Sequence, residues 1–315
     1  MAMEPVYSVV VPLYNEQEVI GEAYRRLTEV MEKTGEAYEL VFVNDGSRDD
    51  TLALARGLRQ KDERVKLLSF SRNFGHQIAI TAGMDYARGQ AIVVIDADLQ
   101  DPPEVILPMI EKWKEGYAVV YGLRAVRKGE TAFKKLTASV FYRFLRRMTE
   151  VDVPADVGDF RLIDRKVCRA LQSLPERNRY VRGLVSWVGF KQTGVSYTRE
   201  ERFAGETKYP LKKMLKLAGD AIASFSYKPL KWPVFLGAFL MVGSGVYLLA
   251  LLIRVLTAGV LQGEALLMMG LVLFFLGAAL ALMGAVGGYI GRICDEVKGR
   301  PLYILEDVEG LEKQN

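Results

Sequence analysis

The chain has 315 residues, of which 50% are hydrophobic, with 29 glycines, 11 prolines and 2 cysteines. This composition argues against a disordered chain, a collagen or a disulfide scaffold, and it predicts a packed protein. The formal net charge of +4, from 42 Lys and Arg against 38 Asp and Glu, is too small to indicate a nucleic-acid-binding protein, so any basic surface must come from local clusters.

Short apolar segments alternate with helical segments through the N-terminal part of the chain, residues 1–227. Almost wholly apolar, β-branched segments are expected to form strands at 6–11, 39–43, 65–70 and 91–95. Crossover helices are expected at 16–33, 51–61, 77–88 and 103–114. Strand, helix and strand in this order predict a doubly wound, Rossmann-like, mainly parallel α/β sheet, whose ligand lies beyond the carboxyl ends of the strands.

The segment after each expected strand is polar. In chain order these segments read PLYNE (12–16), NDGS (44–47), SRNFGH (71–76) and DADLQD (96–101). None matches GxGxxG or GxxxxGK[ST], so a nicotinamide dinucleotide site or a P-loop is poorly supported.

Asp96, Asp98 and Gln100 alternate at the end of an apolar strand, so three oxygen ligands can converge there. Carboxylate and amide oxygens suit Mg²⁺ or Mn²⁺, which commonly take their remaining ligands from substrate phosphates. The alternative is that the Asp101-Pro102-Pro103 segment only starts a helix and the acids cap it. That alternative explains Asp101 but leaves the two earlier acids without a reason, so we favour a metal site.

Basic and apolar residues intersperse in two later stretches, 130–148 and 210–226. This pattern is typical of amphipathic helices in the lipid headgroup layer, where anionic lipid attracts basic side chains. Solvated helix faces are the alternative for most of these lysines and arginines.

Two long runs, 234–253 and 265–291, contain no Asp, Glu, Lys, Arg or His. Twenty helical residues rise about 30 Å, the thickness of the bilayer's hydrocarbon layer, so these runs predict a transmembrane hairpin over 228–291. In the second run, Gly284 and Gly288, like Gly287 and Gly291, stand in small-xxx-small register, which permits close helix approach within the hairpin or in a homo-oligomer.

Basic residues around the hairpin predict its orientation. They are Lys228 and Lys231 before the first run, Arg254 in the linker, and Arg292, Lys298 and Arg300 after the second run. The positive-inside rule then places the domain 1–227 and the tail 292–315 in the cytoplasm, with the hairpin in the inner (plasma) membrane. We expect no cleavable signal peptide, because the chain runs at once into strand-like sequence.

The motifs together resemble a known family. PLYNE, VNDGSRDDT, SRNFGHQ and DADLQDPPE, followed by YGLRAVRKGETAFKK, DVGDFRLIDR, RFAGETKYPLKK and GRICDEVKGRPLY, are similar to family 2 glycosyltransferases of the GT-A fold. The similarity is greatest to the polyprenyl-phosphate branch, in particular to bactoprenol glucosyltransferases, with dolichol-phosphate mannose synthases as relatives. It implies a nucleotide-sugar donor, a divalent cation, and transfer to a lipid phosphate with inversion at the anomeric carbon.

The resemblance also implies roles for single residues. It assigns Asp96, Ala97 and Asp98 to the donor, and Asp98 and Gln100 to the metal beside the diphosphate. His76, the chain's one histidine, suits a polar helix entry better than acid–base catalysis. The pocket for the base and ribose is assigned to Pro12, Tyr14, Asn15, Glu16 and Asp45. The sugar end of the donor site is assigned to Asn73 and Gly75. Candidates for binding the acceptor phosphate or the donor diphosphate are Arg124, Arg127, Arg202 and Lys208.

Asp159 and Asp156 lie in the region of the family's catalytic acid. A lipid monophosphate has a second pKa of about 6 and is already mostly anionic near neutral pH, so a base is less critical than for a hydroxyl acceptor. We expect Asp159 to orient the acceptor or take a residual proton, with Asp156 as the second choice. A structural salt bridge from either acid to Arg161 or Arg165 is the alternative.

The leading expectation is an inverting, Mg²⁺- or Mn²⁺-dependent transferase that moves glucose from UDP-glucose to undecaprenyl phosphate at the cytoplasmic membrane face. GDP-mannose, UDP-GlcNAc or an aminoarabinose nucleotide are alternative donors. A processive polysaccharide synthase is disfavoured, because the chain lacks the QxxRW signature. A non-catalytic, nucleotide-binding membrane scaffold is the alternative from another class.

Overall fold

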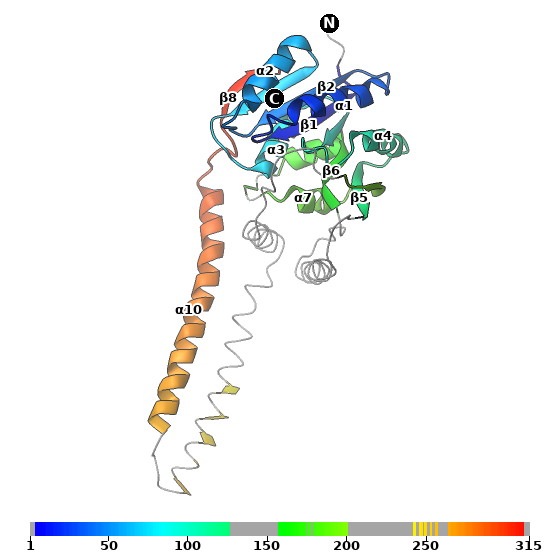
Figure 1. Cartoon of the computed structure of the whole chain (residues 1–315). Coiled ribbons are helices and arrows are strands. Elements are labelled where there is room, and N and C mark those ends of the chain that lie inside the picture. The colour runs from blue at the N-terminus through cyan, green and yellow to red at the C-terminus, as the bar shows by residue number, and fades with distance from the viewer. Residues whose placement is uncertain are drawn as a thin grey trace. The chain divides into compact units, whose positions relative to one another are not determined.

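The computed structural model of the chain describes residues 4–126, 157–174, 176–177, 179–200 and 264–311, together with scattered residues between 242 and 257. The chain divides into two compact units: Met1–Ala221 with Pro301–Asn315, and Ile222–Arg300. The second unit contains helix α10, Glu264–Val297. The functional residues discussed below belong to the first unit (Figure 1).

The described residues of the first unit build an eight-stranded sheet in the order β7-β5-β6-β4-β1-β2-β3-β8. Its strands are β1 Tyr7–Leu13, β2 Tyr38–Asn44, β3 Val65–Phe70, β4 Ala91–Val94, β5 Val119–Val126, β6 Val157–Asp164, β7 Gln192–Thr198 and β8 Leu305–Glu309. Strands β4, β1, β2 and β3 are mutually parallel. Strand β6 runs antiparallel to β4 and β5, and β8 runs antiparallel to β3.

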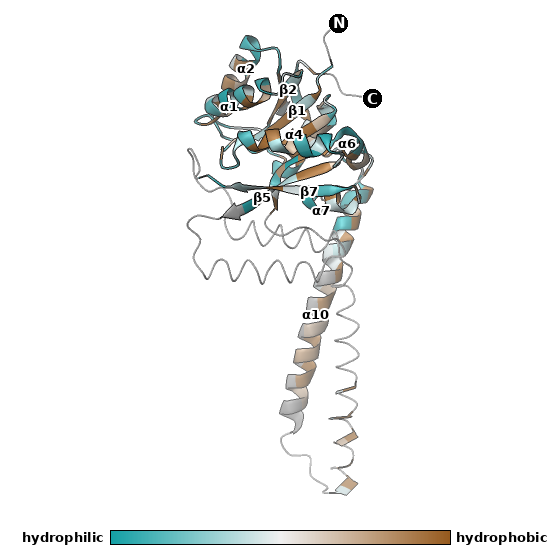
Figure 2. Ribbon diagram, turned by 90° about the vertical axis from the view of Figure 1, so that its right-hand side faces the viewer, coloured by the Kyte–Doolittle hydropathy of each residue, from teal (hydrophilic) through white to brown (hydrophobic). Residues whose placement is uncertain are grey.

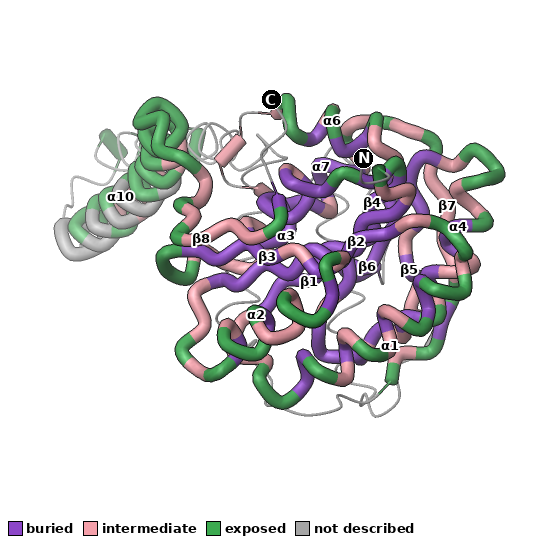
Figure 3. Tube along the Cα trace, turned by 90° about the horizontal axis from the view of Figure 1, so that it is seen from above, coloured by how far each residue is buried: buried purple, intermediate pink, exposed green. Residues whose placement is uncertain are grey.

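Helices cover both faces of this sheet (Figure 3). They are α1 Ile20–Glu32, α2 Thr51–Lys61, α3 His76–Tyr86, the 3-10 turn η1 Pro103–Val105, α4 Ile106–Lys114, α6 Arg165–Gln172 and α7 Val181–Trp187. Apolar residues of α1, α2 and α4 join one buried cluster with alternate residues of β1. Hydrophobic residues concentrate on the central strands, and hydrophilic ones on α6 and the outer part of α2 (Figure 2). The sheet is therefore buried on both faces, as its apolar strands require.

Helix α3 packs on the opposite face of β1 at very short range. A Cβ placed on Gly83 of α3 would lie 2.2 Å from Cγ1 of Val10 and 3.1 Å from Cγ2 of Val43. Only glycine fits this contact without movement of the helix or the strands. The close approach fixes the height of α3 over the sheet, and with it the position of the first residue of α3, His76.

The α/β fold and the four predicted parallel strands are confirmed. The predicted hairpin is not supported: within the described residues, none of the helices combines the length and the apolarity needed to cross a bilayer. The run 265–291 lies within α10. Most of the run 234–253 and the two amphipathic segments, 130–148 and 210–226, lie outside the described residues.

Candidate functional site

The carboxyl ends of β4, β1, β2 and β3 lie along one edge of the sheet, because these four strands are parallel neighbours. All four polar segments predicted as ligand-binding loops begin there. The point where the strand order reverses lies between β1 and β4, the place where open α/β sheets bind ligands.

The loop after β1 is tied to the loop after β2 by hydrogen bonds from main-chain N–H groups to side-chain oxygens. Asn15 adopts a left-handed conformation with φ of 54°. Its N–H donates to Oγ of Ser47 at 3.0 Å, and its Oδ1 accepts the N–H of Arg48 at 2.8 Å. The N–H of Glu16 donates to Oγ1 of Thr51 at 2.8 Å. Asn15 and Glu16 thus hold two predicted donor-binding loops against each other, while Pro12 lies within β1, opposite Val43, and Tyr14 follows the end of that strand.

Asp45 is buried at the end of β2 and organises the loop after β3. Its Oδ1 accepts the N–H of Phe74 at 2.6 Å, and its Oδ2 accepts the N–H of Gly75 at 3.0 Å. Nδ2 of Asn73 donates to the Asp45 carbonyl oxygen at 3.2 Å. Burial raises the pKa of Asp45, and the two N–H groups oppose that rise only in part. Asp45 therefore has a structural task, and its expected contact with a base or ribose stays a prediction.

The acids after β4 differ in their surroundings. Oδ1 of Asp96 is buried and receives no hydrogen bond from the described residues, although Nε2 of His76 lies 3.3 Å away. Burial raises the pKa of Asp96 to about 6, against the opposing charge of His76. Asp98 is also buried, and its Oδ1 accepts the N–H of Gln100 at 3.1 Å. Ala97, between the two acids, is buried as well.

A divalent cation fits these acids chemically. Among the described residues, no group of three or more His, Cys, Asp or Glu side chains is placed to hold a metal ion. Asp96 and Asp98 nonetheless offer hard carboxylate oxygens, and the buried Oδ1 of Asp96 lacks the hydrogen bond that such an atom requires. A cation or a polar ligand group would supply the missing partner.

Asp159, on β6, is held by a residue that the sequence analysis did not single out. Nε of Arg182 lies 2.8 Å from Oδ1 of Asp159, and Nη2 lies 2.8 Å from Oδ2. Burial alone would raise the pKa of Asp159, but the charge and hydrogen bonds of Arg182 outweigh it and hold the pKa well below its usual range. Asp159 is therefore an anion at neutral pH and a weak proton acceptor.

The two arginines considered as partners of Asp159 have other roles. Nη2 of Arg161 donates to the Gly158 carbonyl oxygen at 2.8 Å, and Nε donates to that of Asp159 at 3.3 Å. Nε of Arg165 donates to the carbonyl oxygen of Gly89 at 2.8 Å. The ion-pair partner of Asp159 is thus Arg182 of α7, and neither of the two arginines named in the alternative.

His76 lies between the acids of two strands. Its Nε2 is 3.3 Å from Oδ1 of Asp96 and 3.4 Å from Oδ2 of Asp159. Burial alone would lower the pKa of His76, but the two carboxylates outweigh it and raise the pKa to about 9. His76 does begin α3, as expected, and as a cation it also links the loop after β4 to β6. Gln77 extends the network, because its Nε2 donates to Oδ2 of Asp159 at 3.3 Å.

Arg124, on β5, is fixed over the loop that follows β4. Its Nη2 lies 3.4 Å from Oδ2 of Asp101, and its Nε donates to the hydroxyl of Tyr197 at 3.3 Å. The Tyr197 hydroxyl in turn donates to Oδ1 of Asp101 at 2.5 Å. Asp101 is thus a buried ion-pair partner, and η1 begins without a side-chain cap, so the capping interpretation of Asp101 is wrong. The predicted site residues Arg127, Asp156, Arg202 and Lys208 lie outside the described residues.

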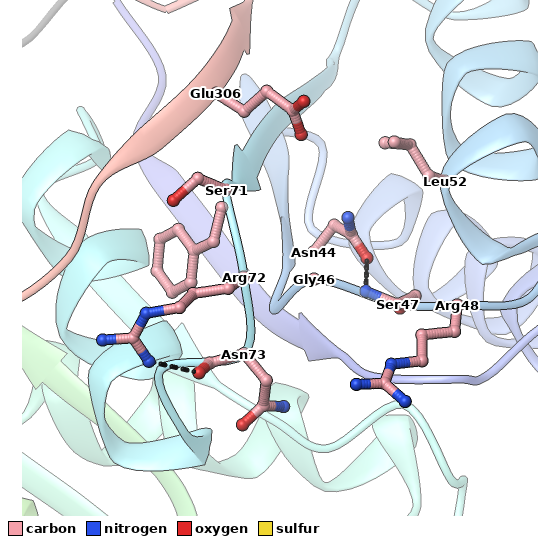
Figure 4. A pocket seen from close by; sticks show the side chains of 10 residues that line it. Asn44, Gly46, Ser47, Arg48, Leu52, Ser71, Arg72, Asn73 and Glu306 are labelled. Carbon is pink, nitrogen blue, oxygen red and sulfur yellow. Dashed lines mark hydrogen bonds between the residues drawn. The ribbon is translucent and has the colours of Figure 1, made fainter.

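A pocket of about 310 Å³ opens beside the ends of β2 and β3 (Figure 4). It is lined by Asn44, Gly46, Ser47, Arg48, Leu52, Phe70, Ser71, Arg72, Asn73 and Glu306. Gly46, with φ of +63°, is required here, because a Cβ on it would lie 2.5 Å from the main-chain carbon of Arg72. Of the predicted donor-binding residues, only Asn73 lines this pocket directly.

Sequence comparison shows which known proteins are similar to this chain. The profile described as "Glycosyl transferase family 2" matches residues 8–172. The "uncharacterized glycosyltransferase YkcC" of Bacillus subtilis is 60% identical over 310 residues, covering 98% of this chain and 95% of that protein. The "SfII prophage-derived bactoprenol glucosyl transferase" of Shigella flexneri is 41% identical over 300 residues, covering 95% of this chain and 97% of that protein.

Among solved structures, the chain is similar to glucosyl-3-phosphoglycerate synthase from Mycobacterium tuberculosis in complex with Mn²⁺, UDP and glucosyl-3-phosphoglycerate. The TM-score is 0.46 at 20% identity, and the match covers 70% of this chain and 78% of that one. A likeness this weak carries no conclusion about donor or metal.

Proposed function

Because this chain belongs to glycosyl transferase family 2, we propose that it transfers a hexose, glucose from UDP-glucose, to undecaprenyl phosphate with inversion at the anomeric carbon. The observation that carries the proposal is the 41% identity, over 95% of this chain, to a protein named as a bactoprenol glucosyl transferase. Glycosyl transfer itself follows from the family. The donor, the acceptor and the stereochemistry are the proposal.

The arrangement of charges around Asp159 supports a phosphate acceptor. One-step inversion requires the acceptor oxygen in line behind the anomeric carbon, opposite the leaving diphosphate, so positioning is the main task. An acceptor hydroxyl would need a base, and the Arg182 ion pair makes Asp159 a poor one. A lipid monophosphate arrives already deprotonated and needs none. Asp159 then acts by orienting Arg182 and His76 at the site, rather than by taking a proton.

Asp96 and Asp98 are the residues proposed to hold Mg²⁺ or Mn²⁺, with Gln100 beside them. Once bound, such an ion would offset negative charge on the leaving nucleoside diphosphate. Within the chain itself, Asp98 is oriented by the Gln100 N–H, and Asp96 is held near the His76 cation. The Asp98 carboxylate is thereby oriented before any ligand arrives, which lowers the cost of binding.

We also propose that the protein is anchored in the inner (plasma) membrane as a homo-oligomer, with the transferase unit at the cytoplasmic face. The charge-free runs 234–253 and 265–291 and the basic residues that flank them support the anchor. Anchoring would bring the donor site to a lipid acceptor that does not leave the bilayer.

The direct test is to incubate the purified full-length protein with labelled UDP-glucose, Mg²⁺ and undecaprenyl phosphate. A lipid-linked monosaccharide is expected. A water-insoluble polymer would indicate a polysaccharide synthase, and nucleotide binding without turnover would indicate a scaffold. A panel of GDP-mannose, UDP-GlcNAc and aminoarabinose nucleotide, read by mass spectrometry of the lipid product, tests the choice of donor.

A further inference from the structure

We propose that Glu306, on the C-terminal strand β8, is a specificity residue that accepts a hydrogen bond from the nucleoside of the sugar donor. This inference rests on the proposed function and adds to it a residue distant in sequence from the motifs described above. It begins from the pocket at the ends of β2 and β3, where Glu306 is the one carboxylate among the lining residues (Figure 4).

Strand β8 is fixed against the sheet by several independent contacts. It pairs antiparallel with β3, Leu68 standing opposite Val308. Nη2 of Arg56 lies 2.7 Å from Oδ2 of Asp307, and its Nε lies 2.9 Å from Oε1 of Glu309. These contacts hold β8 in place as one wall of the pocket.

The segment just before β8 is equally well held. The ring of Tyr303 stacks on Phe70, with centroids 5.3 Å apart, and its hydroxyl donates to Oδ2 of Asp85 at 2.9 Å. The carbonyl oxygen of Ile304 accepts the N–H of Ser71 at 3.1 Å. Phe70 and Ser71 themselves line the pocket, so the tail and the loop after β3 are joined at the site.

Glu306 differs from the other acids of β8 in having no partner of this kind. Arg56 occupies Asp307 and Glu309, whereas no hydrogen bond or ion pair to the described residues engages the Glu306 side chain. A carboxylate is an acceptor only, so what it recognises must carry N–H or O–H groups. Nucleobase edges and ribose hydroxyls provide both.

The position of the pocket favours the nucleoside over the diphosphate. The ends of β2 and β3 lie two and three strands from the end of β4, where Asp96 and Asp98 lie, a separation of about 10–14 Å along the sheet edge. A nucleotide-sugar donor whose diphosphate lies beside those acids and their ion would therefore place its nucleoside in this pocket. Phe70 and Leu52 supply apolar surface, and amides, hydroxyls and the arginines Arg48 and Arg72 line the rest. The Arg72 guanidinium is engaged by the ring of Phe74, whose centroid lies 4.0 Å from its central carbon.

The test measures donor kinetics and binding for Glu306→Gln in the full-length protein. Loss of one hydrogen bond to a charged group predicts an increase of about tenfold in the KM for UDP-glucose and in the Kd for uridine. The kcat at saturating donor should hold, because the reacting atoms are remote. The matched control is Glu36→Gln, which removes the same charge from an exposed residue at the amino end of β2.

Pyrophosphate binding distinguishes a nucleoside site from a phosphate site, because Glu306→Gln would change the affinity for pyrophosphate only if the pocket binds phosphate. Removing a carboxylate near a phosphate site tightens pyrophosphate, whereas a nucleoside site shows weaker uridine binding and unchanged pyrophosphate binding. The inference is overturned if Glu306→Gln has the same KM for UDP-glucose and the same Kd for uridine as Glu36→Gln. It is also overturned if the only effect of Glu306→Gln is tighter binding of pyrophosphate. Wild-type protein that makes no lipid-linked sugar from any donor overturns the proposed function instead.

Discussion

Both carboxylate oxygens of Asp159 are bound by Arg182, each at 2.8 Å, so a strand and a helix are joined by a two-point ion pair at the edge of the site. The pair is buried on the Asp159 side. Its two hydrogen bonds fix the guanidinium plane as well as its charge, which a lysine at the same position would not achieve.

Removing Arg182 should therefore cost more than removing Asp159. Arg182→Leu removes the two-point partner of a buried carboxylate and leaves only His76 and Gln77 beside it, so the expected loss of unfolding free energy is about 3 kcal/mol. Adding Asp159→Asn removes the carboxylate charge and should restore part of the loss. Thermal or denaturant unfolding of the two single variants and the double variant measures the coupling. Additive losses would show that the pair contributes no interaction energy.

Arg182→Lys tests positioning separately from stability. It keeps the charge but replaces the planar guanidinium with a single ammonium donor, so kcat should fall while the fold persists.

Asp159→Asn should keep a flat pH dependence of kcat near neutrality if no proton is taken there. The contrary result is a wild-type kcat that depends on a base titrating near pH 7, with this pH dependence lost in Asp159→Asn. That result would make Asp159 a general base.

Turnover should require a divalent cation and Asp98. Chelation is expected to abolish transfer, and Mg²⁺ or Mn²⁺ to restore it. Asp98→Ala should abolish metal-dependent turnover while expression is preserved, since the site rather than the core loses a group. Asp295→Ala, which removes an exposed acid of α10, is the control and should keep wild-type activity. Near-normal activity of Asp98→Ala would refute its assignment as a metal ligand.

Two glycines in helices should respond oppositely to alanine. Gly83→Ala places a methyl group against Val10 and should destabilise the protein by about 1–3 kcal/mol through overpacking. Gly57→Ala, in α2, meets nothing within 4 Å and should stabilise it by roughly 0.5–1 kcal/mol through helix propensity. Unfolding measurements on both variants compare them directly. Equal effects of the two would mean that α3 shifts freely on the sheet.

Stability should fall in acid partly through Asp62. Burial raises the pKa of Asp62, but hydrogen bonds from Arg64 and Tyr24 outweigh it, so the pKa lies below its usual value. A carboxyl group with a depressed pKa stabilises the fold above its unfolded pKa of about 3.9, and this contribution is lost as the pH falls through the lower folded value. Asp62→Asn should be less stable near pH 7 and lose less on acidification. Parallel curves for the two proteins would contradict the assignment.

The parallel half of the sheet was predictable because strands covered on both faces must be almost wholly apolar, and β1 to β4 are. The edge strand β8 was not, because its sequence LEDVE is acidic and its partner β3 lies far away along the chain. The polar strand ends were correctly grouped at one edge. Arg182 and Gln77 were missed, because only the packing of α3 and α7 brings them to Asp159; the lone His76 was the one available signal.

Placing the last strand of the sheet near the end of the chain has a consequence for biosynthesis. When residues 4–200 have left the ribosome, β3 still presents an unpaired edge, and it remains open until residues 305–309 are made. An exposed strand edge is a template for wrong pairing between chains. The nascent protein must therefore pass through a vulnerable stage that lasts as long as synthesis of α10 and its surroundings, and chaperone protection of that edge would matter most in this interval.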